Sequence, residues 1–388
     1  MYAGKLVFAQ LMEFLPRHEF SACVARYRGD RRVRDFSCRD QFLCMAFAQL
    51  TGRESLRDVE TCLRAVTPKL YHAGFRSRIA KSTLADANER RDWRIYADFA
   101  QSLIARARRL YAREPLEIEL EAAAYALDST VIELSLGLFP WAHAQRRKAA
   151  VKMHTLLELH GDIPAFVRVS SVKISDAALL DAIPLEAGAY YVLDRGYNDF
   201  GRLRRLTEAG AFFVVRIRKN IVFRRRAGRA VDKTTGLRCD QTVLFSDRRT
   251  HAKYPLPLRR VAFVDAHGRR FRFLTNDFRL PPLAVAQLYR RRWQVELFFK
   301  WIKQHLRLRR FFGRSPNAVK TQVWIAVSVY VLVAVVRREL GVERTMYEIL
   351  QILSVTLFEN QPLLPLLAST DVPIPTTTCP NQLSLFDF

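Results

Sequence analysis

Hydrophobic residues in the first third of the chain recur at the spacing of an amphipathic helix. Three- and four-residue intervals separate them in Asp40–Leu50 and in Trp93–Leu110, and this predicts helices because an α-helix turns every 3.6 residues. Thr83 stands three residues before Asp86, which predicts a capping box at the start of another helix. We therefore expect residues 1–120 to form a helical domain.

The helix that begins near Thr83 places Asn88, Arg90 and Arg91 on its expected exposed side. Two interpretations have equal weight. The helix could enter a DNA groove and use these three side chains for binding, or it could present an ordinary solvated polar face.

The pattern changes after residue 120, where short apolar runs predict strands. Tyr125–Ile132 is one such strand and carries Asp128, and Tyr190–Leu193 is another and ends at Asp194. Two further runs flank His160–Asp162, which predicts a hairpin. The other elements expected here are a helix and a strand, at Asp199–Ala209 and Phe212–Val215. This order of elements predicts a mixed α/β sheet over residues 121–215.

Residues 216–275 read as a basic, β-rich insertion. Gly201–Ala230 contains ten Lys or Arg and Glu208 as its one acid. Helices are then expected at Leu283–Leu306, Gln322–Leu340 and Met346–Leu357. We assign residues 276–340 to the rest of the catalytic domain and residues 341–372 to a C-terminal helical segment. Residues 373–388 form a Pro/Thr linker with its tail.

Composition and charge narrow the class of protein. The 388 residues are 49% hydrophobic, which excludes a disordered chain. The net charge of +25 favours a polyanion as partner, with nucleic acid first, over a cationic surface kept for solubility. The apolar run Trp324–Val336 is too short to span a bilayer. No secretory signal or C-x-x-C pair is visible, so we expect a cytoplasmic protein without a structural zinc site.

Three acids stand in apolar or ordered settings: Asp128, Asp194 and Glu296. A carboxylate in such a setting is costly unless it is paired or binds a metal. Oxygen ligands from two strands and a helix suit a hard divalent cation. Two Mg²⁺ ions held by these acids would promote phosphodiester transfer.

The helix that carries Glu296 presents a stripe of four polar side chains. Tyr289, Arg292, Glu296 and Lys303 fall within about 60° of one another at about 100° per residue. This suits a face directed at metal and phosphate, but Arg292 and Glu296 could also form an i,i+4 ion pair on a solvated helix. The neighbouring cations favour contact with DNA: Arg290, Arg291 and Lys300.

The spacing Tyr289-x2-Arg292-x3-Glu296-x6-Lys303 resembles the signature of bacterial transposases of the insertion-sequence-four type. Asp128, in Leu-Asp-Ser-Thr, resembles the first catalytic acid of that family. Asp194, followed by Arg195-Gly-Tyr, resembles its second. The N-terminal part resembles the helical domain of one branch, at Gln49–Asp58 and Lys81–Arg90. The resemblance spans nearly the whole chain, to about residue 360.

This resemblance implies a ribonuclease H-like catalytic domain, interrupted by a β-rich insertion between Asp194 and Glu296 and preceded by a helical DNA-binding domain. It implies cleavage at transposon ends and strand transfer by the 3′-hydroxyl, with Asp128, Asp194 and Glu296 holding two Mg²⁺ ions, for which Mn²⁺ can substitute. It also implies a homodimer on paired ends that acts on target DNA in the bacterial cytoplasm, at the nucleoid. We count Arg195 and the signature residues among the DNA contacts.

Many relatives stack a flipped base on an aromatic residue of the insertion. All five tryptophans of this chain lie outside residues 195–290. If a base is flipped, Phe223, Phe245, Tyr254 or another ring must hold it, and otherwise the route differs from that of these relatives.

The C-terminal tail carries a separate motif. Its residues Gln382, Leu383, Leu385 and Phe386 resemble the peptide by which bacterial proteins bind the replicative sliding clamp. The alternative is that this apolar peptide packs on the protein's own surface.

Two other functions compete with transposition. A metal-dependent nuclease on the same fold would share the three acids and cut without joining. A non-catalytic DNA-binding protein derived from a transposase would be expected to lack at least one acid, and all three are present.

Overall fold

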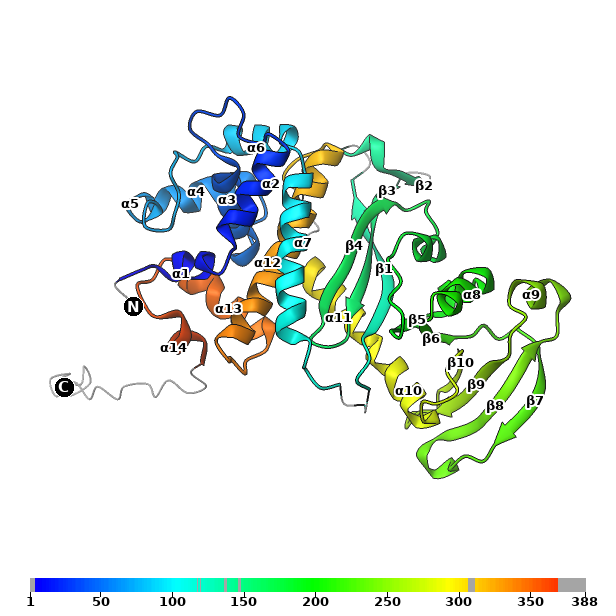
Figure 1. Cartoon of the computed structure of the whole chain (residues 1–388). Coiled ribbons are helices and arrows are strands. Elements are labelled where there is room, and N and C mark those ends of the chain that lie inside the picture. The colour runs from blue at the N-terminus through cyan, green and yellow to red at the C-terminus, as the bar shows by residue number, and fades with distance from the viewer. Residues whose placement is uncertain are drawn as a thin grey trace, which may run out of the picture.

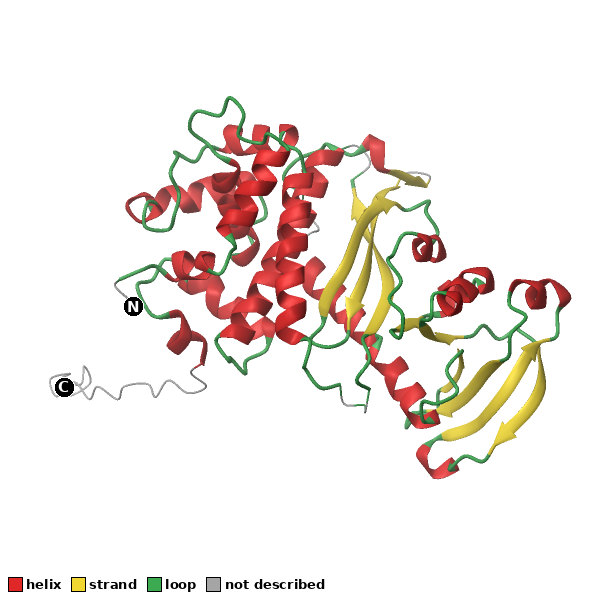
Figure 2. Cartoon of the chain, viewed as in Figure 1, coloured by secondary structure: helices red, strands yellow, loops and turns green. Residues whose placement is uncertain are grey.

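The structure, a computed structural model, describes residues 4–116, 118, 120–135, 138–145, 148–305 and 311–368. Figure 1 shows helices from both ends of the chain gathered on one side of a central sheet, with the strands of the insertion extending from the other side. Figure 2 shows the same division by type of element. The mixed α/β fold class and the N-terminal helical region are therefore confirmed.

The N-terminal region consists of helices, as its hydrophobic spacing predicts. They are α1 (Val7–Glu13), α2 (Arg17–Arg26), α3 (Cys38–Leu50), α4 (Leu56–Ala65), α5 (Thr67–Leu70), α6 (Lys81–Arg90) and α7 (Arg94–Tyr111). Helix α3 is buried along almost its whole length and starts at a capping box between Ser37 and Asp40. The capping box predicted at Thr83 is wrong, because α6 already begins at Lys81 and its N-cap, Ala80, has no side-chain cap.

The strands described form one ten-stranded sheet. They are β1 (Ala124–Leu134), β2 (His143–Gln145), β3 (Lys148–Glu158), β4 (Ile163–Ser171), β5 (Tyr190–Leu193), β6 (Phe212–Arg216), β7 (Phe223–Arg229), β8 (Leu237–Phe245), β9 (Leu258–Val264) and β10 (Arg270–Thr275). β4, β3, β1, β5 and β6 lie side by side in that order. β3 is antiparallel to β1 and β4, whereas β1, β5 and β6 are parallel. This is the ribonuclease H-like sheet that the resemblance implies.

Short helices connect these strands: η1 (Pro140–Ala142), η2 (Asp176–Asp181), η3 (Arg195–Tyr197), α8 (Phe200–Glu208), η4 (Lys233–Thr235) and α9 (Arg248–Lys253). The hairpin expected at residues 160–162 joins β3 to β4.

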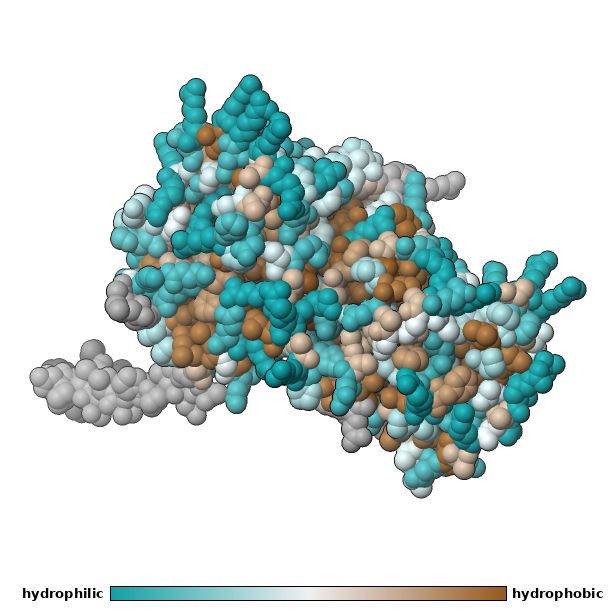
Figure 3. Space-filling model, in the orientation of Figure 1, coloured by the Kyte–Doolittle hydropathy of each residue, from teal (hydrophilic) through white to brown (hydrophobic). Residues whose placement is uncertain are grey.

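The insertion extends the catalytic sheet rather than forming a separate one. β10 pairs antiparallel with β6, and β9, β8 and β7 follow it in order. Arg259 of β9 and Asp240 of β8 form a buried bidentate ion pair, with N–O distances of 2.8 and 2.9 Å. The outer strand β7 is mostly exposed, so its arginines face solvent, and Figure 3 shows hydrophilic side chains along this edge of the molecule.

The last helices run from the sheet into the helical lobe. They are α10 (Pro282–Arg291), α11 (Trp293–Lys300), the π-helix η5 (Trp301–His305), α12 (Pro316–Glu339), α13 (Met346–Thr356) and α14 (Leu363–Ala368). The helix predicted over Leu283–Leu306 is present up to His305, the last described residue of this segment, but it is not continuous, because it is interrupted at Arg292. Tighter i→i−3 hydrogen bonds form there, from Arg292 N to Tyr289 O and from Val295 N to Arg292 O, both 3.1 Å.

Helix α12 is the central helix of the molecule. It packs against α7, α3 and α6, and its residues Val323–Val336 are all buried. Of the described helices it is the one whose length and composition would allow a membrane crossing, and 94% of its most apolar segment is inside the protein. Its apolar side chains are therefore part of the hydrophobic core.

Candidate active site

The register of the sheet brings the first two predicted acids together. Leu127 of β1 pairs in parallel with Leu193 of β5, so Asp128 and Asp194, the next residue on each strand, lie at neighbouring positions. Asp194 directly follows β5 and is the N-cap of η3, where its Oδ1 accepts a hydrogen bond from the Gly196 N–H at 2.7 Å. The two carboxylates are therefore adjacent at the point where the parallel pairing of β1 and β5 ends.

Helix α11 packs on β1 and adds the third acid, Glu296. Arg292 links two of the three carboxylates: it donates to Asp128 Oδ2 at 2.8 Å and to Glu296 Oε1. Its side chain is 14% exposed. The i,i+4 ion pair considered for a solvated helix is therefore present, but it is directed into the site and shared with the β1 acid.

The environment of Asp128 is unfavourable for a negative charge. The pKa of Asp128 is raised to about 6, chiefly by burial and in smaller part by the charges of Asp194 and Glu296, while the N–H of Ser129 and the Arg292 guanidinium act to lower it. Three acids whose charges act on one another in a partly buried site need a cation.

A divalent metal ion fits the chemistry of this site, although the side chains would have to rearrange to bind it. Within the described residues, no three His, Cys, Asp or Glu side chains are arranged to hold an ion as they stand. The contacts give the reason, because Arg292 occupies an oxygen of both Asp128 and Glu296. Carboxylate oxygens are the donors that hard cations prefer, so Asp128 and Glu296 could exchange the guanidinium for a metal ion that Asp194 would also bind.

A second polar cluster supports β1 behind Asp128, and sequence reasoning missed it. Asp176 of η2 accepts hydrogen bonds from Ser129 Oγ at 2.6 Å and from Lys152 Nζ at 3.1 Å. His154 lies 3.9 Å from the same carboxylate oxygen. No spacing in the sequence signals this cluster, because its members come from two strands and a turn.

Tyr197 is a further residue that the sequence did not single out. It is 1% exposed, and its hydroxyl has no hydrogen-bond partner among the described atoms. Burial, followed by the charges of Asp128, Asp176 and Asp194, raises its pKa. Its hydroxyl therefore stays protonated beside the acids and is available as a donor.

The predicted DNA-contacting side chains around the site differ in exposure. Arg195, Arg290 and Lys300 are exposed, which leaves them open to contact with a ligand. Tyr289 is buried, with its ring 4.7 Å from that of Phe273 between centroids.

Two other predicted DNA contacts are only partly accessible. Arg291 is half-buried. The pKa of Asp162 is raised to about 6 by burial, and the charge of Arg291 acts against this rise. Lys303 is half-buried on the π-helix η5, where the assumed 100° per residue no longer holds. The four-residue stripe is thus a sequence spacing rather than one exposed face.

The expected exposed position of Asn88 on α6 is wrong. Asn88 is 1% exposed and accepts a hydrogen bond from Gln41 Nε2 at 2.7 Å. Arg91 is also turned inward and donates to Ser37 O at 2.8 Å, whereas Arg90 is exposed and pairs with Asp86. The interpretation of α6 as a DNA-reading helix therefore has one accessible residue, Arg90, in place of three.

The three rings named as candidates to hold a flipped base differ in burial. Phe245 and Tyr254 are in the core, and Phe223 alone of the three candidates reaches the surface. Trp293, which follows Arg292 directly, is 57% exposed. The motif at Gln382, Leu383, Leu385 and Phe386 lies outside the described residues.

Comparison with known proteins gives consistent matches. A family model described as "Transposase DDE domain" matches residues 120–332, and one described as "Domain of unknown function (DUF4372)" matches residues 3–76. A protein of Sinorhizobium fredii named as transposase y4zB is 35% identical over 258 residues, which is 66% of this chain and 71% of that protein.

Two further relatives are named as transposases of insertion sequences. One, for element IS5377 of Geobacillus stearothermophilus, is 31% identical over 53% of this chain and 54% of its own length. The other, for element IS4SA of a Synechocystis strain, is 25% identical over 73% of this chain and 79% of its own length.

A solved structure of the piggyBac transposase synaptic complex with hairpin DNA covers 92% of this chain and 81% of that chain, with a TM-score of 0.47 and 8% identity.

Proposed function

Because the chain belongs to the DDE transposases of bacterial insertion sequences, we propose that it carries out cut-and-paste DNA transposition. It binds the terminal inverted repeats of its element, cleaves the DNA at the ends and joins the freed 3′-hydroxyls to target DNA. The Tyr-Arg-Glu-Lys spacing supports placing it in the insertion-sequence-four type.

The observation that carries this proposal is the convergence of Asp128, Asp194 and Glu296 from two adjacent parallel strands and a helix. These acids are the residues that would hold two Mg²⁺ or Mn²⁺ ions. Bound there, the ions would activate a water or a 3′-hydroxyl and stabilise the leaving oxygen.

The chain's own side chains position the DNA. Arg195, Arg290 and Lys300 are exposed close to the acids in the sequence and can hold phosphate oxygens. Arg292 has a planar fork of donors that suits a phosphate as well as the two carboxylates that it now joins. Lys303 and Tyr289 complete the set proposed from the signature.

The partners follow from the same chemistry. We propose that two copies of the chain pair the two transposon ends in the bacterial cytoplasm and then engage target DNA. The C-terminal motif at residues 382–386 would bring the complex to the replicative sliding clamp and so to newly replicated DNA.

The test is cleavage of a duplex that carries the element's own end, with Mg²⁺ and with EDTA. We expect Glu296→Gln to abolish cutting at the boundary and to leave end binding within a few-fold of wild type, because the metal ligand is lost while the phosphate contacts remain. Glu208→Gln is the matched control, since Glu208 is an exposed acid paired with Arg204 on α8. Specific end binding without any metal-dependent cutting by the wild type would refute the enzyme and leave a DNA-binding protein.

A metal nuclease on the same fold is the alternative, and strand transfer separates the two. A pre-cleaved end should be joined to a supercoiled target plasmid by the transposase. Cutting without joining under these conditions would favour the nuclease.

A further inference from the structure

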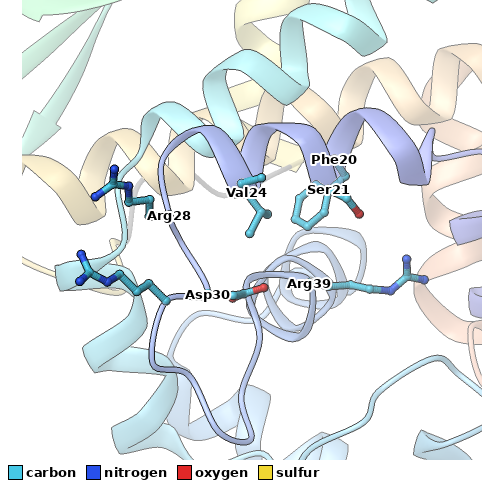
Figure 4. Close-up of a pocket in the computed structure, with 8 residues that line it drawn as sticks. Phe20, Ser21, Val24, Arg28, Asp30 and Arg39 are labelled. Atoms are coloured by element: carbon cyan, nitrogen blue, oxygen red, sulfur yellow. The ribbon is translucent and has the colours of Figure 1, made fainter.

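The turn between α2 and α3 forms a pocket rimmed by arginines. It has a volume of about 480 Å³ and is hereafter the arginine pocket, lined by Phe20, Val24, Arg28, Asp30, Arg31 and Arg39. Figure 4 shows Phe20 and Val24 on the α2 wall, with Arg28 and Arg39 extending on opposite sides. The pocket belongs to the N-terminal lobe and lies outside the catalytic acids.

The wall of the arginine pocket is apolar and fixed. The Phe20 ring packs edge-on against Phe99 and Phe42, at 4.9 and 5.6 Å between centroids. Val24 is 9% exposed. Such a wall suits an apolar group of a ligand.

The arginines at the rim are not held in ion pairs within the described residues, although the Asp30 carboxylate lines the same pocket. Arg28, Arg31 and Arg39 form no ion pair in the part of the chain that the structure describes. Other arginines of the same lobe do pair: Arg26 with Asp98, Arg64 with Glu60, Arg90 with Asp86 and Arg94 with Asp92. The rim arginines are therefore available to an external anion.

The charges that face Arg39 strengthen this argument. Burial lowers the pKa of Arg39, and the charges of Arg17 and Arg76 lower it further, against the charge of Asp40. Asp30, the acid in the pocket, uses its Oδ1 to accept a hydrogen bond from the Cys38 N–H at 2.6 Å. Cations that lie near one another at a half-buried position are stabilised when an anion joins them.

The turn is held in place before any ligand binds. A Cβ at Gly29 would meet Ile95 Cδ1 at 2.5 Å and Cys38 Sγ at 2.7 Å, so the backbone lies directly against α7 and α3. The Gly29 N–H donates to Val24 O at 2.9 Å. A turn fixed in this way loses little conformational entropy on binding.

We propose that the arginine pocket binds the phosphodiester backbone of duplex DNA, with its arginines on successive phosphates and its apolar wall against a deoxyribose. The inference rests on the proposed function and assigns a binding role to the domain of unknown function at residues 3–76. It moves the N-terminal DNA contact from α6 to the α2–α3 turn. The DNA can be an element end or target DNA, since the backbone chemistry is the same.

The experiment measures the salt dependence of DNA binding by fluorescence anisotropy. The full-length wild type and Arg31→Gln/Arg39→Gln are titrated with a labelled 30-bp duplex from the element's end and with an unrelated 30-bp duplex. Arg64→Gln/Arg94→Gln removes the same charge from paired surface arginines of the same lobe and is the matched control. Arg31→Lys/Arg39→Lys keeps the charge and should restore most of the binding.

The slope of log K against log salt is negative, and we expect Arg31→Gln/Arg39→Gln to make it less steep by about 1.8, or about 0.9 for each phosphate contact that is lost. Between 50 and 200 mM salt, the ratio of the wild-type binding constant to that of this variant then falls roughly twelve-fold. The control should keep the wild-type slope.

Each outcome has a separate meaning. A wild-type slope in a folded Arg31→Gln/Arg39→Gln variant would overturn the arginine pocket and leave the proposed function standing. If the wild type binds neither duplex, the proposed function fails first. Loss on the element end alone assigns the pocket to end binding, and equal loss on both duplexes assigns it to any DNA backbone.

Discussion

Replacing Arg292 by glutamine removes the cation that joins two of the proposed catalytic acids. In the wild type its guanidinium donates to Asp128 and Glu296. The variant leaves both carboxylates in place, beside Asp194, with no positive charge between them. We expect it to unfold more readily in the absence of metal.

The magnitude follows from burial. Breaking a fully buried ion pair costs about 3–5 kcal/mol because it leaves an uncompensated charge. The side chains of Asp128 and Glu296 are 21% and 34% exposed, so water screens part of that charge. We therefore expect the free energy of unfolding to fall by about 2 kcal/mol.

The assay is urea unfolding at pH 8 in EDTA, followed by tryptophan fluorescence. Arg269→Gln is the control, because Arg269 and Asp265 form an i,i+4 pair whose arginine is 69% exposed, and its loss should cost under about 0.5 kcal/mol. In a Glu296→Gln background the effect of Arg292→Gln should drop by about half, since one orphaned charge is gone. Mg²⁺ should stabilise Arg292→Gln more than the wild type.

Two results would refute this reasoning. One is a loss for Arg292→Gln no larger than for the exposed control. The other is strict additivity with Glu296→Gln, which would mean that Arg292 does not compensate the acids.

Burial lowers the pKa of His154 to about 4, so the native state keeps it neutral while the unfolded chain takes up a proton. Stability should therefore be lost as pH falls from about 6.5 to 4, by about 3 kcal/mol, and urea unfolding of His154→Gln at several pH values should show a flatter profile. Gly161 has φ +96°, and an added Cβ would lie 2.2 Å from Tyr111 Cδ1; Gly161→Ala should cost about 2–4 kcal/mol. Gly188→Ala, at φ +82° in open space, should cost only about 1 kcal/mol in the same thermal unfolding series. Deleting residues 381–388 should abolish pull-down of the sliding clamp and leave cleavage of naked DNA intact; retained pull-down would contradict the clamp motif.

The sequence located the three acids without the structure because each stands in a recognisable local pattern. Asp128 lies in an apolar strand, Asp194 follows one, and Glu296 lies within a spaced signature.

Burial could not be read from local patterns. Asn88 belongs to a polar stretch, yet Gln41 from another helix accommodates it in the core. The signature helix is interrupted at Arg292 and continues into a π-helix, in a segment that packs on β1 and α12.

The sequence by itself indicated the helical and strand-rich regions of this protein, their order and the three candidate acids, since helix and strand periods and short motifs act over a few residues. Only the tertiary structure decided which charges meet. It placed Arg292 between Asp128 and Glu296, gathered Asp176 with Ser129 and Lys152, and, within the described residues, left the arginines of the arginine pocket without an ion pair. The physical reason is that Coulomb and hydrogen-bond energies depend on distance and burial, which residues far apart in the chain acquire only when the sheet and helices pack.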